Sequence, residues 1–204
     1  MISFAPMMYG RLLDVGCGTK PYRKLFSAVN DYVGLEIDSA ESRVAKRADY
    51  FYDGNKFPFT DESYDCAICN QVLGHVFTPD DFLQEIVRTL KSGDLLLLTV
   101  PFVWDEHEQP YDYARYSSFG LRSLLERNGF IVIEQQKTNA DARILFQLAN
   151  AYLYKTLYTR NAKLNFVICA IIMGPINMLG ILIAKLLPGN PDLFLDQVVL
   201  ARKR

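Results

Sequence analysis

Two glycines and two carboxylates in the first forty residues have the types and spacing needed to bind a small polar ligand. An apolar run ends at Asp14-Val15, and Gly16-Cys17-Gly18 follows it directly. Because glycine has no Cβ, such a turn lets backbone N–H groups come close to a ligand and point at it. Asp14 is placed to bind an ammonium group or to hold the turn from below. Glu36 follows Gly16 by 20 residues, the spacing at which a carboxylate at a strand end meets ribose hydroxyls in doubly wound folds.

Apolar runs and helical stripes alternate along the chain and would position these residues. Leu12 to Val15 suits a strand that is covered on both faces of a parallel sheet, and a helix is expected to begin near Pro21. Thr78-Pro79 has the residues of a helix N-terminus, and Gly93 and Gly129 are expected to end helices. The predicted strands lie within residues 11–15, 31–38, 48–59, 64–72, 95–100, 130–136 and 193–201, and the predicted helices within 21–30, 78–91 and 118–128. The 204 residues suffice for one α/β domain, which we expect to be 1–204.

The run Leu13-Asp14-Val15-Gly16-Cys17-Gly18 resembles motif I of the class I S-adenosylmethionine-dependent methyltransferases, type 11-like. The third glycine of the dinucleotide-binding fingerprint is absent, because Pro21 takes its place in Gly16-x-Gly18-x-x-Pro21. The resemblance implies a Rossmann-like, doubly wound α/β fold, with a mostly parallel seven-stranded sheet whose last strand is reversed. It also implies S-adenosylmethionine as the cofactor and no metal. It covers about residues 11–137 and the closing strand.

In this family, acids at the ends of successive strands bind the cofactor. The resemblance gives the methionine end to Asp14 and the glycine turn, the ribose to Glu36, and the adenine amino group to Asp53. The alternative for Asp53-Gly54 is a simple turn. Asn70 and Gln71 close the fourth predicted strand, where ligands of open α/β sheets bind. The predicted cofactor-binding residues are Asp14, Gly16, Cys17, Gly18, Glu36, Ile37, Asp53, Gly54, Asn70 and Gln71.

The segment from Pro101 to Tyr116 has the composition of a pocket wall rather than of a spacer. It combines aromatic, acidic and amide side chains with one histidine and one arginine, directly after the fifth predicted strand. It resembles the Pro-Phe…His-Glu-x-Pro-x-Asp-Tyr-x-Arg segment of one methyltransferase subgroup, in which this loop lies over the acceptor side of the active site. Tyr111, Tyr113 and Arg115 are therefore expected to bind the acceptor, and Arg115 suits one that carries a carboxylate or phosphate.

The two histidines are candidates for different roles. His107 lies in this segment, and an ordinary histidine pKa of about 6.5 would let it take a proton from an acceptor hydroxyl. Its alternative role is a hydrogen-bond anchor that fixes the loop, and the sequence does not separate the two. His75, in Gly74-His75-Val76, is expected to be a packed imidazole beside the adenosine. We group it with the substrate-binding residues rather than with the catalytic ones.

Residues 140–190 form an apolar insertion that the resemblance does not cover, and they are expected to be helical. No charged side chain occurs from Phe166 to Ala184, a run long enough to span a bilayer by length alone. Gly174-Pro175 is expected to break the run into two pieces that are each too short to cross. A single crossing would also separate the last strand from its sheet. A buried helical hairpin, a homodimer surface and a peripheral membrane contact are left, and the sequence favours packing or dimerisation.

Composition and charge exclude several other classes of partner. The formal net charge of -1 gives no surface for a polyanion, so nucleic acid is not expected. Cys66 and Cys69 lie three residues apart in a predicted strand and so point to opposite faces, which argues against a metal or redox site. Residues 1–10 lack the basic start and apolar run of a signal peptide. The expected location is the cytoplasm, with attachment to the inner face of the membrane as the alternative.

The predicted function is methyl transfer to a small-molecule acceptor, such as a sugar or a lipid-linked hydroxyl. One alternative is a scaffold protein that keeps the cofactor fold and uses the insertion as a partner surface. The other is an NAD-dependent oxidoreductase, which Pro21 and the absence of a Tyr-x-x-x-Lys pair after the fifth predicted strand disfavour. The methylated atom (oxygen, nitrogen or carbon) and the oligomeric state are left open.

Overall fold

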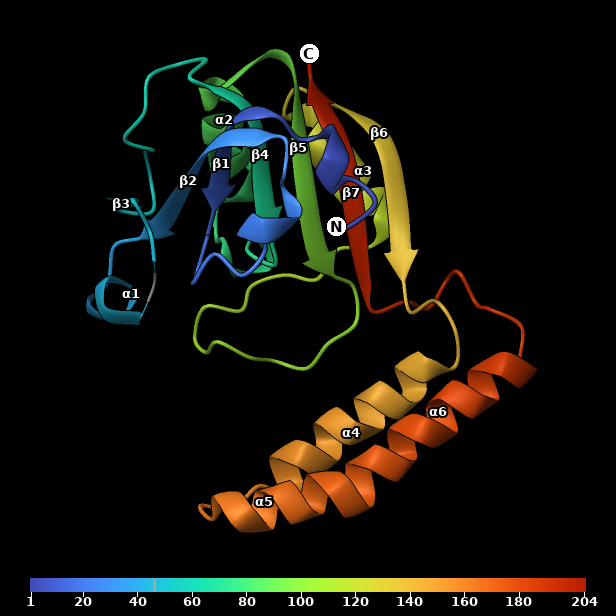
Figure 1. Cartoon of the computed structure of the whole chain (residues 1–204). Coiled ribbons are helices and arrows are strands. Elements are labelled where there is room, and N and C mark those ends of the chain that lie inside the picture. The colour runs from blue at the N-terminus through green and yellow to red at the C-terminus, as the bar shows by residue number, and fades with distance from the viewer. Residues whose placement is uncertain (46) are drawn as a thin grey trace. The chain divides into compact units, whose positions relative to one another are not determined.

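A computed structural model of the chain describes residues 1–45 and 47–204 and contains a seven-stranded sheet accompanied by helices (Figure 1). The strand order is β3-β2-β1-β4-β5-β7-β6. The strands are β1 (Gly10–Val15), β2 (Val29–Ile37), β3 (Tyr50–Tyr52), β4 (Tyr64–Asn70), β5 (Leu90–Pro101), β6 (Phe130–Thr138) and β7 (Asp196–Lys203). The α-helices are α1 (Ala40–Ala45), α2 (Pro79–Thr89), α3 (Ser118–Arg127), α4 (Arg143–Leu157), α5 (Ala162–Ile168) and α6 (Gly174–Leu186). Short 3-10 turns η1 (Ala5–Met7), η2 (Arg23–Leu25) and η3 (Leu73–His75) and a π-helical turn η4 (Cys169–Met173) complete the order. The predicted α/β fold is confirmed.

The sheet is mostly parallel, and its last strand is reversed. β1 pairs in parallel with β2 and β4, β2 with β3, and β4 with β5. Arg204 N–H, after β7, donates to the carbonyl of Gly129 before β6, whereas Leu195 N–H, before β7, donates to Thr138 at the end of β6. β7 therefore runs against β6, as Figure 1 also shows, and the predicted topology is confirmed. The carboxyl ends of the parallel strands share one edge, where ligands of such sheets bind.

Alternate residues of the strands enter two separate cores. Leu13 of β1 lies in the cluster that includes side chains of α2 and α3, and Leu12 lies in a second cluster with Phe26 from the N-terminal part of the chain. Cys66 and Cys69 of β4 divide between the two clusters in the same way, as strand alternation predicts. Burial raises the pKa of both thiols to about 12.

The prediction of a helix over residues 21–30 is wrong. The structure has only the 3-10 turn η2 there, and β2 begins at Val29. Thirteen residues, from Gly16 to Ala28, connect β1 to β2. A crossover that includes a helix needs about a dozen residues or more, and the glycine turn already uses part of this connection. Buried Phe26 then holds the short connection against the sheet.

The second correction concerns the boundary between α2 and β5. The helix begins at Pro79, although the Thr78 side chain makes no capping hydrogen bond, and it ends at Thr89 rather than at Gly93. β5 starts at once with Leu90. The residues around Gly93, which has φ +86°, form an irregularity within β5, since Tyr64 pairs with Leu90 and Cys66 with Leu95. Gly93 therefore permits a bulge instead of ending a helix.

The described residues form two compact units. The sheet unit comprises Met1–Pro101, Glu108–Gln136 and Gln197–Arg204, and the hairpin unit comprises Phe102–His107 and Lys137–Asp196. The hairpin unit contains α4, α5 and α6, so the insertion is helical as predicted. The expectation that both units belong to one domain stays a prediction.

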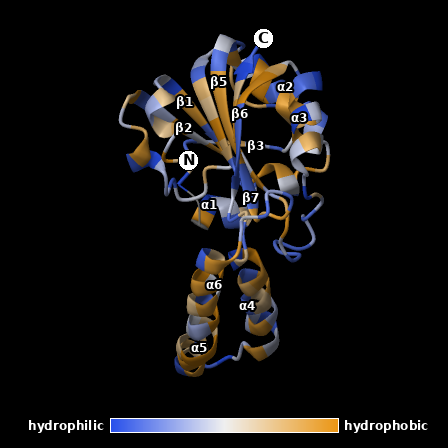
Figure 2. Cartoon of the chain, turned by 90° about the vertical axis from the view of Figure 1, so that its right-hand side faces the viewer, coloured by the Kyte–Doolittle hydropathy of each residue, from blue (hydrophilic) through white to orange (hydrophobic). Residues whose placement is uncertain are grey.

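The helix of the insertion is not broken at Gly174-Pro175, and that prediction is wrong. Helical structure runs without interruption from Ala162 to Leu186, a length of 25 residues. Pro175 occupies the first turn of α6, directly after the π-helical turn η4. Proline lacks an N–H, and a π turn changes the hydrogen-bond pattern where that donor is missing. The chain can therefore pass the proline and remain helical. Figure 2 shows how strongly hydrophobic α5 and α6 are.

Candidate cofactor and active site

The glycine turn after β1 is tightly packed and internally hydrogen-bonded. Gly16 and Gly18 have φ of +70° and +52°, in the left-handed region that favours glycine. A Cβ on Gly16 would lie 2.2 Å from Cγ2 of Val72, in the loop after β4. The N–H groups of Gly16 and Cys17 both donate to the carbonyl of Leu35, at 2.9 and 3.1 Å. Contrary to the prediction, these two N–H groups therefore do not point at a ligand. Glycine is needed at position 16 because a side chain there would collide with Val72.

Asp14 is a buried carboxylate held by a tyrosine that the sequence did not predict as its partner. Its side chain lies at the end of β1 and is 4 % exposed. The Tyr32 hydroxyl, from β2, donates to Asp14 Oδ2 at 2.5 Å. Burial raises the pKa of Asp14 to about 6, against the opposing effects of the Tyr32 hydrogen bond and the Lys20 charge. Only the parallel register, which pairs Leu12 with Tyr32, would have indicated this partner.

Glu36 joins the end of β2 to the glycine turn. Its Oε2 accepts from the N–H of Gly18 at 2.9 Å, and its Oε1 lies 3.3 Å from the N–H of Ile37. Ile37 is exposed, and a Cβ on Gly54 would lie 3.7 Å from its Cδ1. The structure thus brings the predicted ribose carboxylate, the turn after β1 and the loop after β3 to one edge of the sheet.

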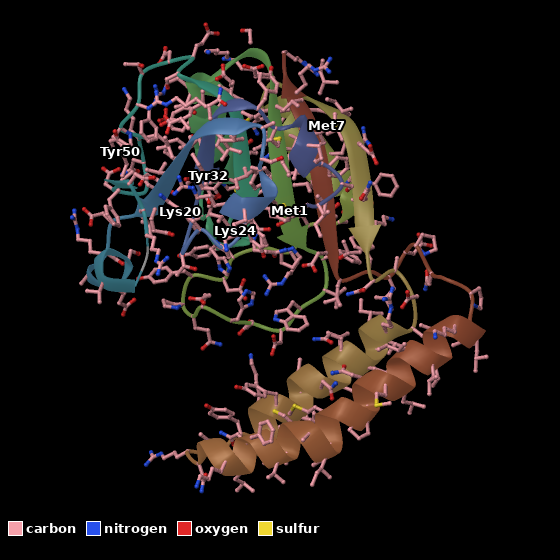
Figure 3. The ribbon with its side chains drawn as sticks, in the orientation of Figure 1. Met1, Met7, Lys20, Lys24, Tyr32 and Tyr50 are labelled. Atoms are coloured by element: carbon pink, nitrogen blue, oxygen red, sulfur yellow. The ribbon has the colours of Figure 1, made fainter. Side chains whose placement is uncertain are left out.

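An ion pair that the sequence did not suggest braces the same turn. Lys20 Nζ pairs with Asp49, whose Oδ2 accepts from the N–H of Gly34 at 2.7 Å. The stem of Lys20 lies so close to Gly34 that a Cβ there would meet Lys20 Cε at 2.3 Å and Cys17 Sγ at 2.7 Å. Figure 3 labels Lys20 and Tyr32 in this region. Residues from both sides of β2 therefore fix the conformation of the glycine turn.

Asp53 lies directly after β3, beside the end of β2. Its Oδ1 accepts from the N–H groups of Asn55 and Lys56, at 3.0 and 3.4 Å. The hydrogen bond from the Asn55 backbone is the main cause that lowers the pKa of Asp53. The turn that we considered for Asp53-Gly54 is present, and the adenine contact stays a prediction.

The loop after β4 is held by β5. Thr99 Oγ1 donates to Asn70 Oδ1 at 2.7 Å and accepts from the Gln71 N–H at 3.1 Å. Gln71 has φ +59°, which turns the chain sharply after the strand. Because Val72 contacts Gly16, the loop after β4 lies against the glycine turn. A ligand bound at the loop would therefore also meet the turn.

The predicted acceptor-binding residues of the sheet unit contact η3. Gly74 O accepts from the N–H groups of Tyr113 and Ala114, at 2.9 and 3.1 Å. His75 Nδ1 lies 2.8 Å from the carbonyl of Tyr111. Tyr111 and Tyr113 are both exposed. These contacts place two accessible aromatic side chains and one imidazole close to the loop that ends β4.

Arg115 forms a bidentate ion pair rather than an open anion site. Its Nη1 and Nη2 donate to the two oxygens of Asp112, at 2.6 and 2.8 Å. The Asp112 side chain is 5 % exposed, so the pair is largely removed from water. An acceptor carboxylate or phosphate would have to compete with Asp112, and Arg115 acts first as a brace of this loop.

His107 belongs to the hairpin unit and not to the sheet unit that holds the other candidate residues. Its Nδ1 lies 3.0 Å from the carbonyl of Asp105. Lys155 of α4 pairs with Asp105 at 2.8 Å and donates to the carbonyl of Glu106 at 2.5 Å. The anchor contact that we considered is therefore present, and the role as a base stays a prediction.

Comparison with known proteins agrees with this geometry. A family model described as a methyltransferase domain matches residues 13–98. An uncharacterized methyltransferase of Mycolicibacterium vanbaalenii is 34% identical over 101 residues, covering 46% of this chain and 39% of the relative. The O-methyltransferase cnsE of Penicillium expansum is 27% identical over 158 residues, covering 65% of this chain and 56% of the relative. The chain thus spans less than two thirds of the length of either relative.

Solved structures share the fold at low sequence identity. The [4+2]-cyclase SpnF superposes with a TM-score of 0.65 at 20% identity, over 99% of this chain and 79% of its own. The phosphoethanolamine N-methyltransferase 2 of Haemonchus contortus, solved in complex with S-adenosyl-L-methionine, gives a TM-score of 0.60 at 18% identity, over 98% of this chain and 50% of its own. Such identities establish the fold and leave the reaction open. The methyltransferase-domain match over residues 13–98 and the methyltransferase relative support a class I S-adenosylmethionine-dependent methyltransferase.

Proposed function

We propose that the chain transfers a methyl group from S-adenosylmethionine to a hydroxyl oxygen of a small molecule, such as a sugar or a lipid-linked alcohol. The observation that carries the proposal is the hydrogen bond from the Gly18 N–H to Glu36 Oε2. It makes the glycine turn and the strand-end carboxylate one structural unit. That unit stands at the edge of the sheet where ligands of this fold class bind.

The carboxylates at this edge suit the polar groups of the cofactor. Gly18 holds Oε2 of Glu36, and a carboxylate accepts several hydrogen bonds, so Glu36 can also accept from a ribose hydroxyl. The two turn bonds of Asp53 both use Oδ1, and Oδ2 can accept from the adenine amino group. Asp14 would supply negative charge for the ammonium group of the methionine end. We assign the ribose contact to Glu36, the adenine contact to Asp53 and the ammonium contact to Asp14.

The proposed chemistry requires orientation and one proton acceptor. When bound, S-adenosylmethionine supplies an electrophilic methyl group, and in-line attack by the acceptor oxygen breaks the carbon–sulfur bond with its electron pair passing to sulfur. The hydroxyl proton must go to a base, and we assign His107. The carbonyl of Asp105 can only accept, so Nδ1 of His107 carries the proton and the neutral ring has its lone pair on Nε2. His75 has the same tautomer, because its Nδ1 faces the carbonyl of Tyr111, and it is the second candidate.

An oxygen acceptor is supported by one of the relatives and by the aromatic side chains near η3. The Penicillium expansum relative is named an O-methyltransferase, and it matches the longest stretch of this chain among the two relatives described above. Exposed Tyr111 and Tyr113 present apolar ring faces and hydroxyl groups together, which suits a hydroxylated ring or a lipid-linked alcohol.

The experiment that tests this proposal is methyl transfer from S-adenosylmethionine labelled in its methyl group. The full chain would be incubated with sugars, phenols and isoprenoid alcohols, and the products would be analysed by mass spectrometry. We expect label in a methyl ether, with an equal amount of S-adenosylhomocysteine. Label in an amine, a thiol or a carbon position, with none on oxygen, would contradict the oxygen acceptor.

A further inference from the structure

The long helix of the hairpin unit exposes large apolar side chains along its whole length. Its most apolar window of 18 residues has a mean hydropathy of 2.4, and only 11% of that window is buried. By length and composition this helix could cross a membrane, which by itself is weak evidence. Its exposed large side chains are Leu164, Phe166, Val167, Ile171, Ile172, Met178, Leu179, Ile181, Leu182 and Leu186. So much exposed apolar surface requires a covering partner.

In the hairpin, large apolar side chains of α6 are exposed, whereas the side of α6 that faces α4 carries a glycine and an asparagine. A helix pair in water places its apolar side chains between the helices instead. A Cβ on Gly180 would lie 2.8 Å from Cβ of Phe146. Asn150 of α4 is buried and donates through Nδ2 to Asn177 Oδ1 at 2.8 Å and to Met173 O at 3.2 Å. Small residues that allow close approach and interhelical amide bonds hold helices together in lipid, where no hydrophobic effect drives them together.

The charged residues of the stretch between Ala142 and Pro191, which holds the three helices, are all cations. Between Ala142 and Pro191 the sequence has no Asp or Glu, and its charged residues are Arg143, Lys155, Arg160, Lys163 and Lys185. Arg143 pairs with Asp141 and Lys155 with Asp105, outside that stretch. Among the residues that the structure describes, no acid pairs with Arg160, Lys163 or Lys185. Exposed Tyr154 and Tyr158 lie beside the turn that holds Arg160, as tyrosines do at the interface between lipid and water.

We propose that this hairpin binds the surface of an anionic phospholipid bilayer and buries the apolar side of α5 and α6 in one leaflet. The proposal stands apart from the methyl-transfer reaction. α4 has 15 residues, about 22 Å of helix, which is shorter than the bilayer core of about 30 Å. Both strands that flank the hairpin, β6 and β7, pair in the same sheet. The chain therefore enters and leaves the leaflet on the same side, as a monotopic element does.

The alternative occupant, a second hairpin from another copy, fits the charges less well. Two identical hairpins would bring cations together without a carboxylate from either stretch to pair with them. An anionic lipid surface instead supplies a counter-charge for each Lys or Arg near it. The cations thus favour lipid over a second copy.

The test is flotation of the full-length protein with vesicles of phosphatidylcholine alone and of phosphatidylcholine mixed with phosphatidylglycerol. We expect binding to both, stronger with phosphatidylglycerol and weakened by salt. Phe166→Glu, at a side chain that is 75 % exposed, should lower the partition coefficient about tenfold or more. Phe119→Glu is the matched control, since Phe119 is 82 % exposed on α3 of the sheet unit, and it should leave binding unchanged. Arg160→Glu with Lys163→Glu should abolish the preference for phosphatidylglycerol.

Circular dichroism melts of each variant separate loss of binding from loss of folding, because these side chains are exposed and should leave the melt unchanged. Sedimentation velocity without lipid tests the other occupant. A stable dimer that binds neither vesicle, and that Phe166→Glu converts to a monomer, would overturn the proposal and assign the surface to a second copy. Equal loss of binding in Phe119→Glu would overturn it as well.

Discussion

Glu36 Oε2 accepts a hydrogen bond of 2.9 Å from the N–H of Gly18, and this bond fixes the end of β2 to the turn after β1. Leu35, the residue before Glu36, accepts from the N–H groups of Gly16 and Cys17. The glycine turn is therefore built on β2 as much as on its own strand. A change at Glu36 should affect the shape of the turn as well as the ribose contact assigned to it.

Gly16→Ala tests how closely the turn packs on the loop after β4. The new Cβ would lie 2.2 Å from Val72 Cγ2 at a residue with φ +70°, so strain and overpacking together should lower the free energy of unfolding by about 2–4 kcal/mol. Adding Val72→Ala should remove the steric part, and denaturant unfolding of both single variants and the double variant measures the coupling. Strictly additive losses would show that Gly16 and Val72 do not meet as described.

Asp14→Asn should make stability less dependent on pH. The pKa of Asp14 is about 6 in the fold, and 3.8 is its ordinary value. Between these values the folded state binds more protons than the unfolded state, so this residue's contribution falls as pH rises through that window and stays low above it. The wild type should lose up to about 3 kcal/mol at this site between about pH 4 and pH 7. The asparagine variant keeps an acceptor for Tyr32 and should avoid that loss.

Thermal or urea unfolding of the wild type and Asp14→Asn at several pH values measures this difference. The variant should be the more stable protein at neutral pH, and the two should converge near pH 4. A stability difference that is constant across the range would show that Asp14 does not titrate as its burial implies.

Two bidentate ion pairs of different burial provide a matched comparison. Arg115 and Arg127 each bind both oxygens of an aspartate, but the Asp112 side chain is 5 % exposed and the Asp80 side chain is 49 % exposed. Arg115→Met should cost about 3–5 kcal/mol, because it leaves a buried carboxylate without its cation. Arg127→Met should cost about 1 kcal/mol or less. Equal losses in chemical denaturation would contradict the role of Arg115 as a brace.

His107→Gln tests the proposed base. With an accepted hydroxyl substrate, kcat should fall by about 10²–10⁴. Affinity for S-adenosylmethionine should change little. His75→Gln in the same assay distinguishes the second candidate, since a loss of kcat there and not in His107→Gln would move the role to His75. An unchanged kcat in His107→Gln would contradict its role as the base and favour the anchor contact to Asp105.

Local patterns were enough to predict the strands and the edge of the sheet that holds the candidate site. Buried runs such as 11–15 and 95–100, and the reversed last strand implied by motif I, agree with the structure. The predicted helix after the glycine turn is wrong, although the apolar residues near Phe26 have the spacing of a helical stripe. The connection between β1 and β2 is too short to hold a helix and return to the sheet.

Contacts between distant parts of the chain could not be read from the sequence. The bond from Tyr32 to Asp14 and the pair of Lys20 with Asp49 depend on the register of parallel strands. Helix continuity past Pro175 depends on the π turn before it, for which a sequence of apolar residues gives no sign. The spacing of Asp112 and Arg115 does not reveal that they form an ion pair, and the role of Arg115 in binding the acceptor stays a prediction.

The measurement that tests the central claim most directly is calorimetric titration of the full chain with S-adenosylmethionine. Glu36→Gln is titrated alongside it, with Glu126→Gln, at an exposed side chain of α3, as the control. We expect saturable binding by the wild type and by Glu126→Gln. Affinity should be at least about tenfold weaker in Glu36→Gln, because a charged acceptor shared by Gly18 and the ribose is lost. Folded wild-type protein that binds no S-adenosylmethionine, or binding that Glu36→Gln leaves intact, would contradict the central claim.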